Sequence, residues 1–274
     1  MEKIFLWKTT ESAGTGTGRP EDDFAPYLEP YLLDRSGAPR GCVIVFPGGG
    51  YCVRAPHEAG PIAERFNQMG FHAFVLQYRV APYRYPAPQR DALRAVRLVR
   101  SRAAEWGIAP DRIATLGFSA GGHLCASTGT LYDEVDSTAN DAADRVSPRP
   151  DALILCYAVI NLTDPFGHFG SGENLLGKEG VLSPEAKRFN LETRVTVDTP
   201  PSFLWHTAED TCVNVENSLA FARELWKNKV TAEVHVFPHG HHGLGLAPAM
   251  RDVAQWPELA GCFLVESCGF PARV

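Results

Sequence analysis

One stretch of this 274-residue chain decides its fold: Arg112-Ile113-Ala114-Thr115-Leu116-Gly117-Phe118-Ser119-Ala120-Gly121-Gly122-His123. Ile113, Thr115 and Leu116 suit a buried strand, and the small residues that follow Ser119 favour a helix that starts close to that strand. A strand that leads directly into a helix is the repeating unit of a parallel sheet. The stretch therefore predicts the α/β class.

The same alternation of strands and helices continues on both sides of this stretch. Short apolar runs that suit buried strands lie at residues 42–46, 73–78, 152–157, 203–206 and 234–237. Apolar residues recur at helical spacing within residues 58–69, 88–106 and 219–226. Apolar strands that alternate with amphipathic helices are typical of a mostly parallel central sheet with helices on both faces.

We expect a single domain over residues 1–274, because no internal repeat and no linker divides the chain. Residues 161–201 break the rhythm of strands and helices. They are rich in glycine and polar residues, and about 40 residues without strong periodicity indicate a loop or cap inserted near a site.

The charge balance excludes some classes of function. The chain has 26 basic and 32 acidic residues, a net charge of −6, which disfavours binding to nucleic acid or to an anionic membrane. One predicted helix carries a stripe of four arginines: Arg90, Arg94, Arg97 and Arg100. No aromatic residues interleave with the stripe, so we expect a solvated helix face rather than a nucleic-acid contact.

Targeting signals and cysteine usage bear on the compartment. No window approaches the roughly 18 uninterrupted apolar residues that span a bilayer. The first eight residues lack the apolar run of roughly 7 to 15 residues that a secretory signal needs, so we expect a cytoplasmic protein without a membrane span.

The seven cysteines form no CxxC pair, and Cys42, Cys125 and Cys156 sit inside apolar runs. We expect these three to be buried, reduced thiols.

The first candidate for chemistry is Ser119. Residues 117–121 match the pattern G-x-S-x-G, and the match occurs where a strand gives way to a helix. This chemistry needs a serine on a tight, strained turn with its hydroxyl above the sheet edge, and small residues two positions before and after let the backbone pass closely. A plain glycine turn is the alternative. The context favours a nucleophile.

A second glycine-rich stretch, Phe46-Pro47-Gly48-Gly49-Gly50-Tyr51, follows the first strong strand. Consecutive glycines allow backbone N–H groups to point into a cavity, as an oxyanion hole requires. A dinucleotide-binding loop would need G-x-G-x-x-G at the start of a helix, and here Val53-Arg54-Ala55-Pro56 follows instead. The stretch favours an oxyanion site over a nucleotide site.

An acid and a base are expected downstream of the serine, in the order Ser, Asp, His. The loop after residues 203–206 holds Glu209 and Asp210, and the loop after residues 234–237 holds His241 and His242. Such loops meet Ser119 at the carboxyl edge of a parallel sheet. We take Asp210 as the acid with Glu209 as its competitor, and His242 as the base with His241 second. A metal site is not expected, because zinc ligands normally come from further apart in the chain.

These motifs resemble those of the α/β-hydrolases, and within them the bacterial carbohydrate acetyl esterases that are described as acetylxylan-esterase-like. The matching stretches cover most of residues 40–256 in the family's order: 46–51, 78–82, 85–88, 117–124, 174–177, 205–210 and 237–243.

The resemblance implies a catalytic triad of Ser119, Asp210 and His242. It also implies that the oxyanion donors are backbone N–H groups of Ala120 and of Gly49 or Gly50, and that no cofactor is needed. We further expect three residues to contact the substrate: Tyr51, Asn174 and His168.

The chain departs from the family's pattern at three places. Pro47 stands where lipase-type relatives often have histidine. His241 replaces the second glycine of Gly-Gly-His-Gly, which keeps His241 open beside His242 as the base. Asn214 stands where related chains often have proline after the acid.

The implied reaction is two-step acyl transfer that removes acetyl groups from xylo-oligosaccharides. The partner expected is therefore a small-molecule or oligosaccharide ester. An alternative is the same machinery with another substrate: an aryl or alkyl ester, a feruloyl ester, a formamide or a short peptide. A non-catalytic binding protein on the same scaffold is the third hypothesis, and the intact set of candidate residues argues against it.

Overall fold

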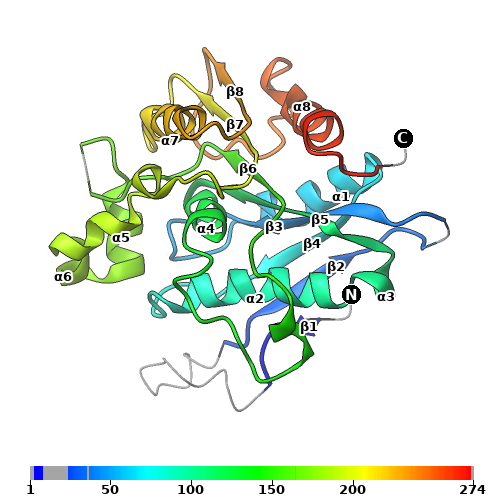
Figure 1. The fold of residues 1–274 in the computed structure, drawn as a ribbon. Helices are drawn as coiled ribbons and strands as arrows, with labels where there is room; N and C mark the ends of the chain where they lie inside the picture. The colour runs from blue at the N-terminus through cyan, green and yellow to red at the C-terminus, as the bar shows by residue number, and fades with distance from the viewer. Residues whose placement is uncertain (1–2, 9–23, 36, 164, 273–274) are drawn as a thin grey trace.

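A central eight-stranded sheet organises the protein (Figure 1). The computed structural model describes residues 3–8, 24–35, 37–163 and 165–272. The strands are β1 (Ile4–Phe5), β2 (Tyr27–Tyr31), β3 (Arg40–Phe46), β4 (His72–Gln77), β5 (Ile108–Phe118), β6 (Ala152–Cys156), β7 (Ser202–Thr207) and β8 (Ala232–Phe237). Their order across the sheet is β1-β2-β4-β3-β5-β6-β7-β8.

The sheet is mostly parallel, as the apolar runs predicted. Only β1 with β2 and β2 with β4 pair antiparallel, at one edge. From β4 to β8 every pair of neighbours is parallel. The ends of these strands lie in register: Phe46 pairs with Gly117, Phe118 with Cys156, and Thr207 with Phe237. The loops that leave them therefore meet at one edge.

Helices and short turns of helix cover the sheet. The α-helices are α1 (Gly60–Gln68), α2 (Ala87–Ser101), α3 (Ala103–Trp106), α4 (Ser119–Thr130), α5 (Phe169–Leu176), α6 (Lys178–Val181), α7 (Glu216–Lys227) and α8 (Trp256–Cys262). The shorter segments are the 3-10 helices η2 (Pro56–Glu58), η3 (Ala142–Arg145), η4 (Pro184–Phe189), η5 (Leu191–Arg194) and η6 (Val253–Gln255), and the π-helix η7 (Phe263–Ser267).

Two buried clusters show that both faces of the sheet are covered. Alternate residues of β3 divide between them: Ile44 packs in a cluster with α2, α4 and α7, whereas Val45 packs in a cluster with α1 and α8. Side chains on a strand point to opposite faces in turn, so each face of the sheet has its own helical layer. This confirms the expected arrangement and explains why the central strands β3 and β6 are almost wholly apolar.

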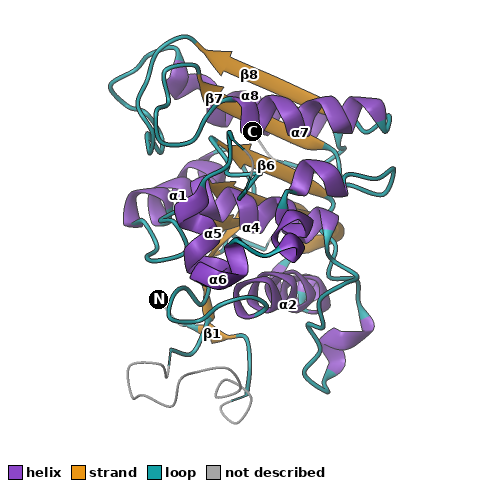
Figure 2. Cartoon of the chain, turned by 90° about the vertical axis from the view of Figure 1, so that its left-hand side faces the viewer, coloured by secondary structure: helices purple, strands orange, loops and turns teal. Residues whose placement is uncertain are grey.

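Residues 161–201 form a string of short helical segments rather than an irregular loop. They contain α5, α6, η4 and η5, and Figures 1 and 2 show α5 and α6 projecting at one side of the sheet. Segments of four to eight residues carry too little periodicity to be read from the sequence. We refer to residues 161–201 as the insertion.

The expectation of a solvated arginine stripe on α2 is wrong. The side chain of Arg94 is only 1% exposed, and its guanidinium pairs with the carboxylates of Asp141 and Asp144. The guanidinium of Arg97 donates to the backbone carbonyls of Asp144 and Val146. The stripe therefore anchors the segment between α4 and β6, whose position the periodicity of α2 alone does not reveal.

Two other expectations concern burial and membranes. Cys42, Cys125 and Cys156 are free and buried, as their apolar surroundings predicted. Within the described residues, no helix has the length and apolar character that a bilayer span demands.

Candidate active site

Ser119 lies at the turn between β5 and α4, as the motif predicted. β5 ends at Phe118 and α4 begins at Ser119, whose φ of 52° lies in the left-handed region that disfavours a side chain. The flanking glycines are required, because a Cβ on Gly117 would lie 2.1 Å from the carbonyl oxygen of Gly121. A Cβ on Gly121 would lie 2.3 Å from the carbonyl oxygen of Phe46. The turn thus holds the serine between two closely packed backbones.

The structure brings Ser119, His242 and Asp210 into one hydrogen-bonded series. The Oγ of Ser119 lies 2.8 Å from Nε2 of His242, and Nδ1 of His242 lies 2.6 Å from Oδ2 of Asp210. A carboxylate only accepts hydrogen bonds, so Nδ1 carries the proton. Nε2 is then free to accept the hydroxyl proton of Ser119.

The carboxylate of Asp210 is held in its charged form. Burial alone would raise its pKa, but hydrogen bonds from His206, from His242 and from the backbone of Val213 outweigh burial and hold that pKa well below its usual range. Oδ1 accepts the N–H groups of Cys212 and Val213, each at 2.9 Å. Asp210 therefore stays ionised at neutral pH and can stabilise an imidazolium that forms at His242 during a reaction.

The competing acid and base lie elsewhere. Glu209 is exposed, and its carboxylate accepts from Nδ1 of His239 at 2.8 Å. His241 is exposed as well, and its Nδ1 lies 2.7 Å from the carbonyl oxygen of His242. The geometry thus selects Asp210 over Glu209 and His242 over His241 as partners of Ser119.

The glycine loop, residues 47–51, packs directly against the serine. A Cβ on Gly48 would lie 3.0 Å from the Cβ of Ser119 and 2.8 Å from the carbonyl oxygen of Phe118. Gly49 and Gly50 have φ angles of 125° and 64°, which only glycine adopts readily. Among the described residues, no backbone carbonyl accepts from the amides of Gly49 or Gly50. Both amides therefore lack a backbone acceptor among the described residues, in the loop whose Gly48 packs against Ser119.

Asn174 and His168 connect the insertion to this site. The side-chain amide of Asn174 on α5 donates to the carbonyl oxygen of Gly50 at 2.9 Å. His168 precedes α5, and its Nδ1 accepts from the backbone N–H of Ser171. Its pKa is lowered, first by burial and then by the nearby His242, so His168 is neutral and close to the histidine of the series. Their predicted role as substrate contacts stays a prediction.

The predicted contact between Tyr51 and substrate finds no support in this geometry. The side chain of Tyr51 is only 1% exposed, and its hydroxyl lies 2.9 Å from Nδ1 of His123. Burial lowers the pKa of His123 to about 4, so that ring is neutral and its Nε2 donates to the carbonyl oxygen of Phe189 at 2.9 Å. Tyr51 therefore links the glycine loop through His123 to η4 of the insertion.

Sequence reasoning missed three buried residues that surround the series. His206, at the end of β7, places Nε2 3.3 Å from Oδ2 of Asp210, and Glu58 and Tyr157 lie beneath the glycine loop. The only available signal was a polar residue in or beside an apolar run. A polar residue in that position is as typical of an ordinary hydrogen bond in the core as of a functional site.

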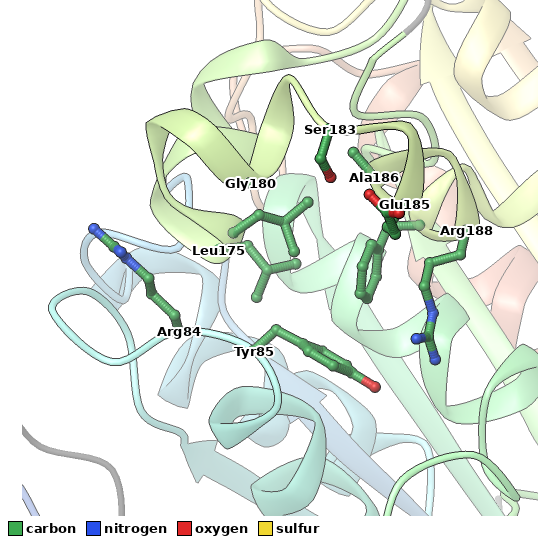
Figure 3. Close-up of a pocket in the computed structure, with 10 residues that line it drawn as sticks. Arg84, Tyr85, Leu175, Gly180, Ser183, Glu185, Ala186 and Arg188 are labelled. Carbon is green, nitrogen blue, oxygen red and sulfur yellow. The ribbon is translucent and has the colours of Figure 1, made fainter.

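A cavity of about 300 Å³ lies between the insertion and the segment before α2 (Figure 3). Its lining combines aromatic, charged and apolar side chains: Arg84, Tyr85, Leu175, Leu176, Gly180, Ser183, Glu185, Ala186, Arg188 and Phe189. The rings of Tyr85 and Phe189 meet edge to face with centroids 4.7 Å apart. Leu175 directly follows Asn174 on α5, and the lining includes none of Ser119, Asp210 and His242.

Metal ligands do not gather at this edge. Within the described part of the chain, no three His, Cys, Asp or Glu side chains are placed to hold a metal ion. His239 and His241 instead contact Glu209 and the backbone. The groups that converge here are a hydroxyl, an imidazole, a carboxylate and backbone amides, which suit acyl transfer.

Comparisons with known proteins identify the family of this chain. Residues 28–225 match the model of the BD-FAE family; this span includes Ser119 and Asp210. The chain is 40% identical over 228 residues to endo-1,4-beta-xylanase B of Butyrivibrio fibrisolvens, which covers 82% of this chain and 35% of that protein. It is 29% identical over 230 residues to the acetylxylan esterase of Xylanibacter ruminicola, with 80% and 45% covered.

A solved structure extends the likeness to almost the whole chain. The acetyl ester-xyloside bifunctional hydrolase from Caldicellulosiruptor lactoaceticus is 46% identical, with a TM-score of 0.90 over 98% of this chain and 96% of that one. The chain spans about a third to a half of the two sequence relatives named above. With a family model that matches most of its length and with this fold, the chain belongs to the BD-FAE family of α/β-hydrolases.

Proposed function

We propose that this protein is a serine esterase that removes acetyl groups from acetylated xylo-oligosaccharides. The observation that carries the proposal is the series Ser119–His242–Asp210 beside the available amides of Gly49 and Gly50. The likeness to an acetyl ester-xyloside hydrolase and to an acetylxylan esterase supports the acetyl substrate.

In the proposed mechanism, Nε2 of His242 takes the proton of Ser119 as Oγ attacks the ester carbonyl. The carboxylate of Asp210 stabilises the imidazolium that forms. Backbone N–H groups of Ala120 and of Gly49 or Gly50 bind the oxyanion, and each donor typically lowers the barrier by roughly 3–4 kcal/mol. His242 then donates this proton to the leaving sugar oxygen as the C–O bond breaks, which forms the sugar hydroxyl and the acyl-enzyme. Water, activated by His242, releases acetate from the acyl-enzyme.

We assign the leaving saccharide to the cavity between the insertion and the segment before α2. Tyr85 supplies an aromatic ring, and Ser183, Glu185 and Arg188 supply hydrogen-bonding groups around it. A volume of about 300 Å³ is at the lower end of small-ligand pockets, a size that suits one or two sugar rings. A simple alkyl ester would not use these polar groups.

Acetate release tests the proposal. Acetylated xylo-oligosaccharides, p-nitrophenyl acetate and p-nitrophenyl butyrate are each offered to the wild type and to Ser119→Ala, with the exposed Ser101→Ala as matched control. We expect the wild type and the control to deacetylate the oligosaccharides and Ser119→Ala to be inactive. Cleavage of the aryl esters alone would refute the carbohydrate substrate, and full activity of Ser119→Ala would refute the nucleophile.

A further inference from the structure

The two loops that must cooperate at this site leave strands that are far apart. The glycine loop follows β3, and the histidine loop, residues 238–246, follows β8; β5, β6 and β7 lie between them. Neighbouring strands are about 4.8 Å apart, so these two strand ends are separated by about 19 Å. The histidine loop has to return across the ends of β7 and β6 before His242 reaches Ser119, which follows β5. A contact that ties the two loops together would define this geometry.

Glu58 and Tyr157 supply such a contact. Oε2 of Glu58, on η2, accepts the backbone N–H of Gly48 at 2.8 Å. Oε1 accepts the hydroxyl of Tyr157, which follows β6, at 2.6 Å. The same hydroxyl oxygen accepts the backbone N–H of Gly245 at 2.9 Å. Two side chains thus form a continuous hydrogen-bonded bridge from the glycine loop to the histidine loop.

Both ends of this bridge lie against the reacting groups. The ring of Tyr157 meets the imidazole of His242 edge to face, with centroids 5.0 Å apart. A Cβ on Gly48 would lie 2.6 Å from Oε2 of Glu58 and 3.0 Å from the Cβ of Ser119. Only the width of a glycine therefore separates the carboxylate from the serine side chain.

The chemistry of the bridge exceeds what packing requires. Glu58 is 2% exposed, and burial of a carboxylate costs several kcal/mol unless hydrogen bonds compensate. Within the described residues, the only basic side chain with a nitrogen within 4.0 Å of its carboxylate is that of His57, whose Nε2 lies 3.6 Å from Oε1. Burial, and then the charge of Glu58, raise the pKa of Tyr157 well above its ordinary value, so the hydroxyl remains a donor. An apolar side chain would fill the same space without these costs.

We propose that Glu58 and Tyr157 are positioning residues that set the distance between the oxyanion donors of the glycine loop and His242. This inference rests on the proposed esterase function of the same site. Neither side chain belongs to the hydrogen-bonded series, and both act through the loops that they join. Their loss should weaken the stabilisation of the transition state more than the binding of the substrate.

Steady-state kinetics of Glu58→Gln, Tyr157→Phe and the double variant test this inference. The matched controls are Glu64→Gln, an exposed glutamate on α1, and Tyr132→Phe, a tyrosine outside the site. A misplacement of about 1 Å costs up to roughly a hundredfold in rate. We expect kcat for p-nitrophenyl acetate to fall tenfold to a hundredfold with KM within about twofold. Because both changes cut the same bridge, the double variant should be no slower than about the worse single variant.

Amide hydrogen exchange gives a second readout that does not depend on turnover. We expect faster exchange in peptides that cover residues 47–51 and 240–246 in either variant, and wild-type exchange in the controls. If Glu58→Gln kept wild-type kcat and wild-type exchange, the proposed role of the bridge would be refuted. It would also be refuted if the variants changed KM rather than kcat, or if the two losses added up in the double variant. If the wild type cleaves no ester while exchange rises in both loops, the esterase function fails and the link between the loops stands. Glu58→Gln keeps the volume of the side chain, so this variant still tests the inference if Tyr157→Phe does not fold.

Discussion

Replacement of Asp210 by asparagine should abolish the proposed reaction by changing the tautomer of His242. Oδ1 of Asp210 accepts two backbone N–H groups, from Cys212 and Val213. An asparagine must therefore place its amide oxygen at that position. Its NH2 group then occupies the position of Oδ2, 2.6 Å from Nδ1 of His242. Two donors cannot face each other, so the imidazole must carry its proton on Nε2.

An imidazole with its proton on Nε2 cannot accept the proton of Ser119. The same loss of a correctly oriented base costs roughly four orders of magnitude in kcat in serine proteases, which corresponds to roughly 5 kcal/mol of barrier. His206 adds to the effect, because its Nε2 lies 3.3 Å from the same Oδ2. We expect Asp210→Asn to fold and to lose activity by about this factor.

The assay is kcat/KM for p-nitrophenyl acetate, measured beside Glu209→Gln. That control changes the adjacent carboxylate, which is exposed and bound to His239, and should keep wild-type activity. If Asp210→Asn retained more than about a tenth of wild-type activity, the tautomer argument would be refuted. If Glu209→Gln lost activity to the same extent, the assignment of the acid would be wrong.

Three further predictions follow from burial, close packing and the cavity. The pKa of His123 is lowered to about 4 in the folded protein, against about 6.5 in the unfolded chain. The unfolded state therefore binds the proton first as the pH falls, and the free energy of unfolding should fall by about 3 kcal/mol between pH 6.5 and 4. Urea titrations should show a shallower pH dependence for His123→Gln. Gly121→Ala would place a methyl group 2.3 Å from the carbonyl oxygen of Phe46 and should lower the free energy of unfolding by about 3 kcal/mol or more. The control Gly170→Ala, whose Cβ would lie 3.8 Å from its nearest neighbour, should leave that free energy unchanged, and equal denaturation midpoints of the two variants would contradict this prediction. Tyr85→Ala should raise KM for acetylated xylo-oligosaccharides several-fold and leave p-nitrophenyl acetate turnover unchanged, and an equal effect on both substrates would exclude the cavity as a sugar site.

The parallel sheet and the site's main residues could be predicted because each depends on local pattern. The apolar runs mark the strands, and G-x-S-x-G at the end of one of them marks Ser119. Parallel strands then bring the loops that hold Asp210 and His242 to the same edge. The sequence favours His242 over His241 but cannot exclude His241, since the choice depends on which ring the loop turns toward Ser119.

The remaining errors have one physical origin, which is the direction of a side chain relative to distant segments. Tyr51 is adjacent in sequence to the glycine loop, but a φ of 59° and the contact with His123 place its side chain in the interior. The sequence predicts solvated arginines on α2 because periodicity identifies one face of a helix. It does not reveal that the segment between α4 and β6 packs against that face. Glu58 and Tyr157 carry no motif at all, because Tyr157 contacts residues 99 and 88 positions away, Glu58 and Gly245, which only tertiary structure brings together.

The contacts between the glycine loop and residues 161–201 bear on how this protein can be engineered. Asn174 holds the carbonyl of Gly50, and the hydroxyl of Tyr51 reaches the carbonyl of Phe189 through His123. The insertion is therefore not an interchangeable module. A graft of this segment from another hydrolase, made to change specificity, would have to carry matching partners for Tyr51 and Gly50. Without them, the grafted segment would disturb the glycine loop, which we propose binds the oxyanion.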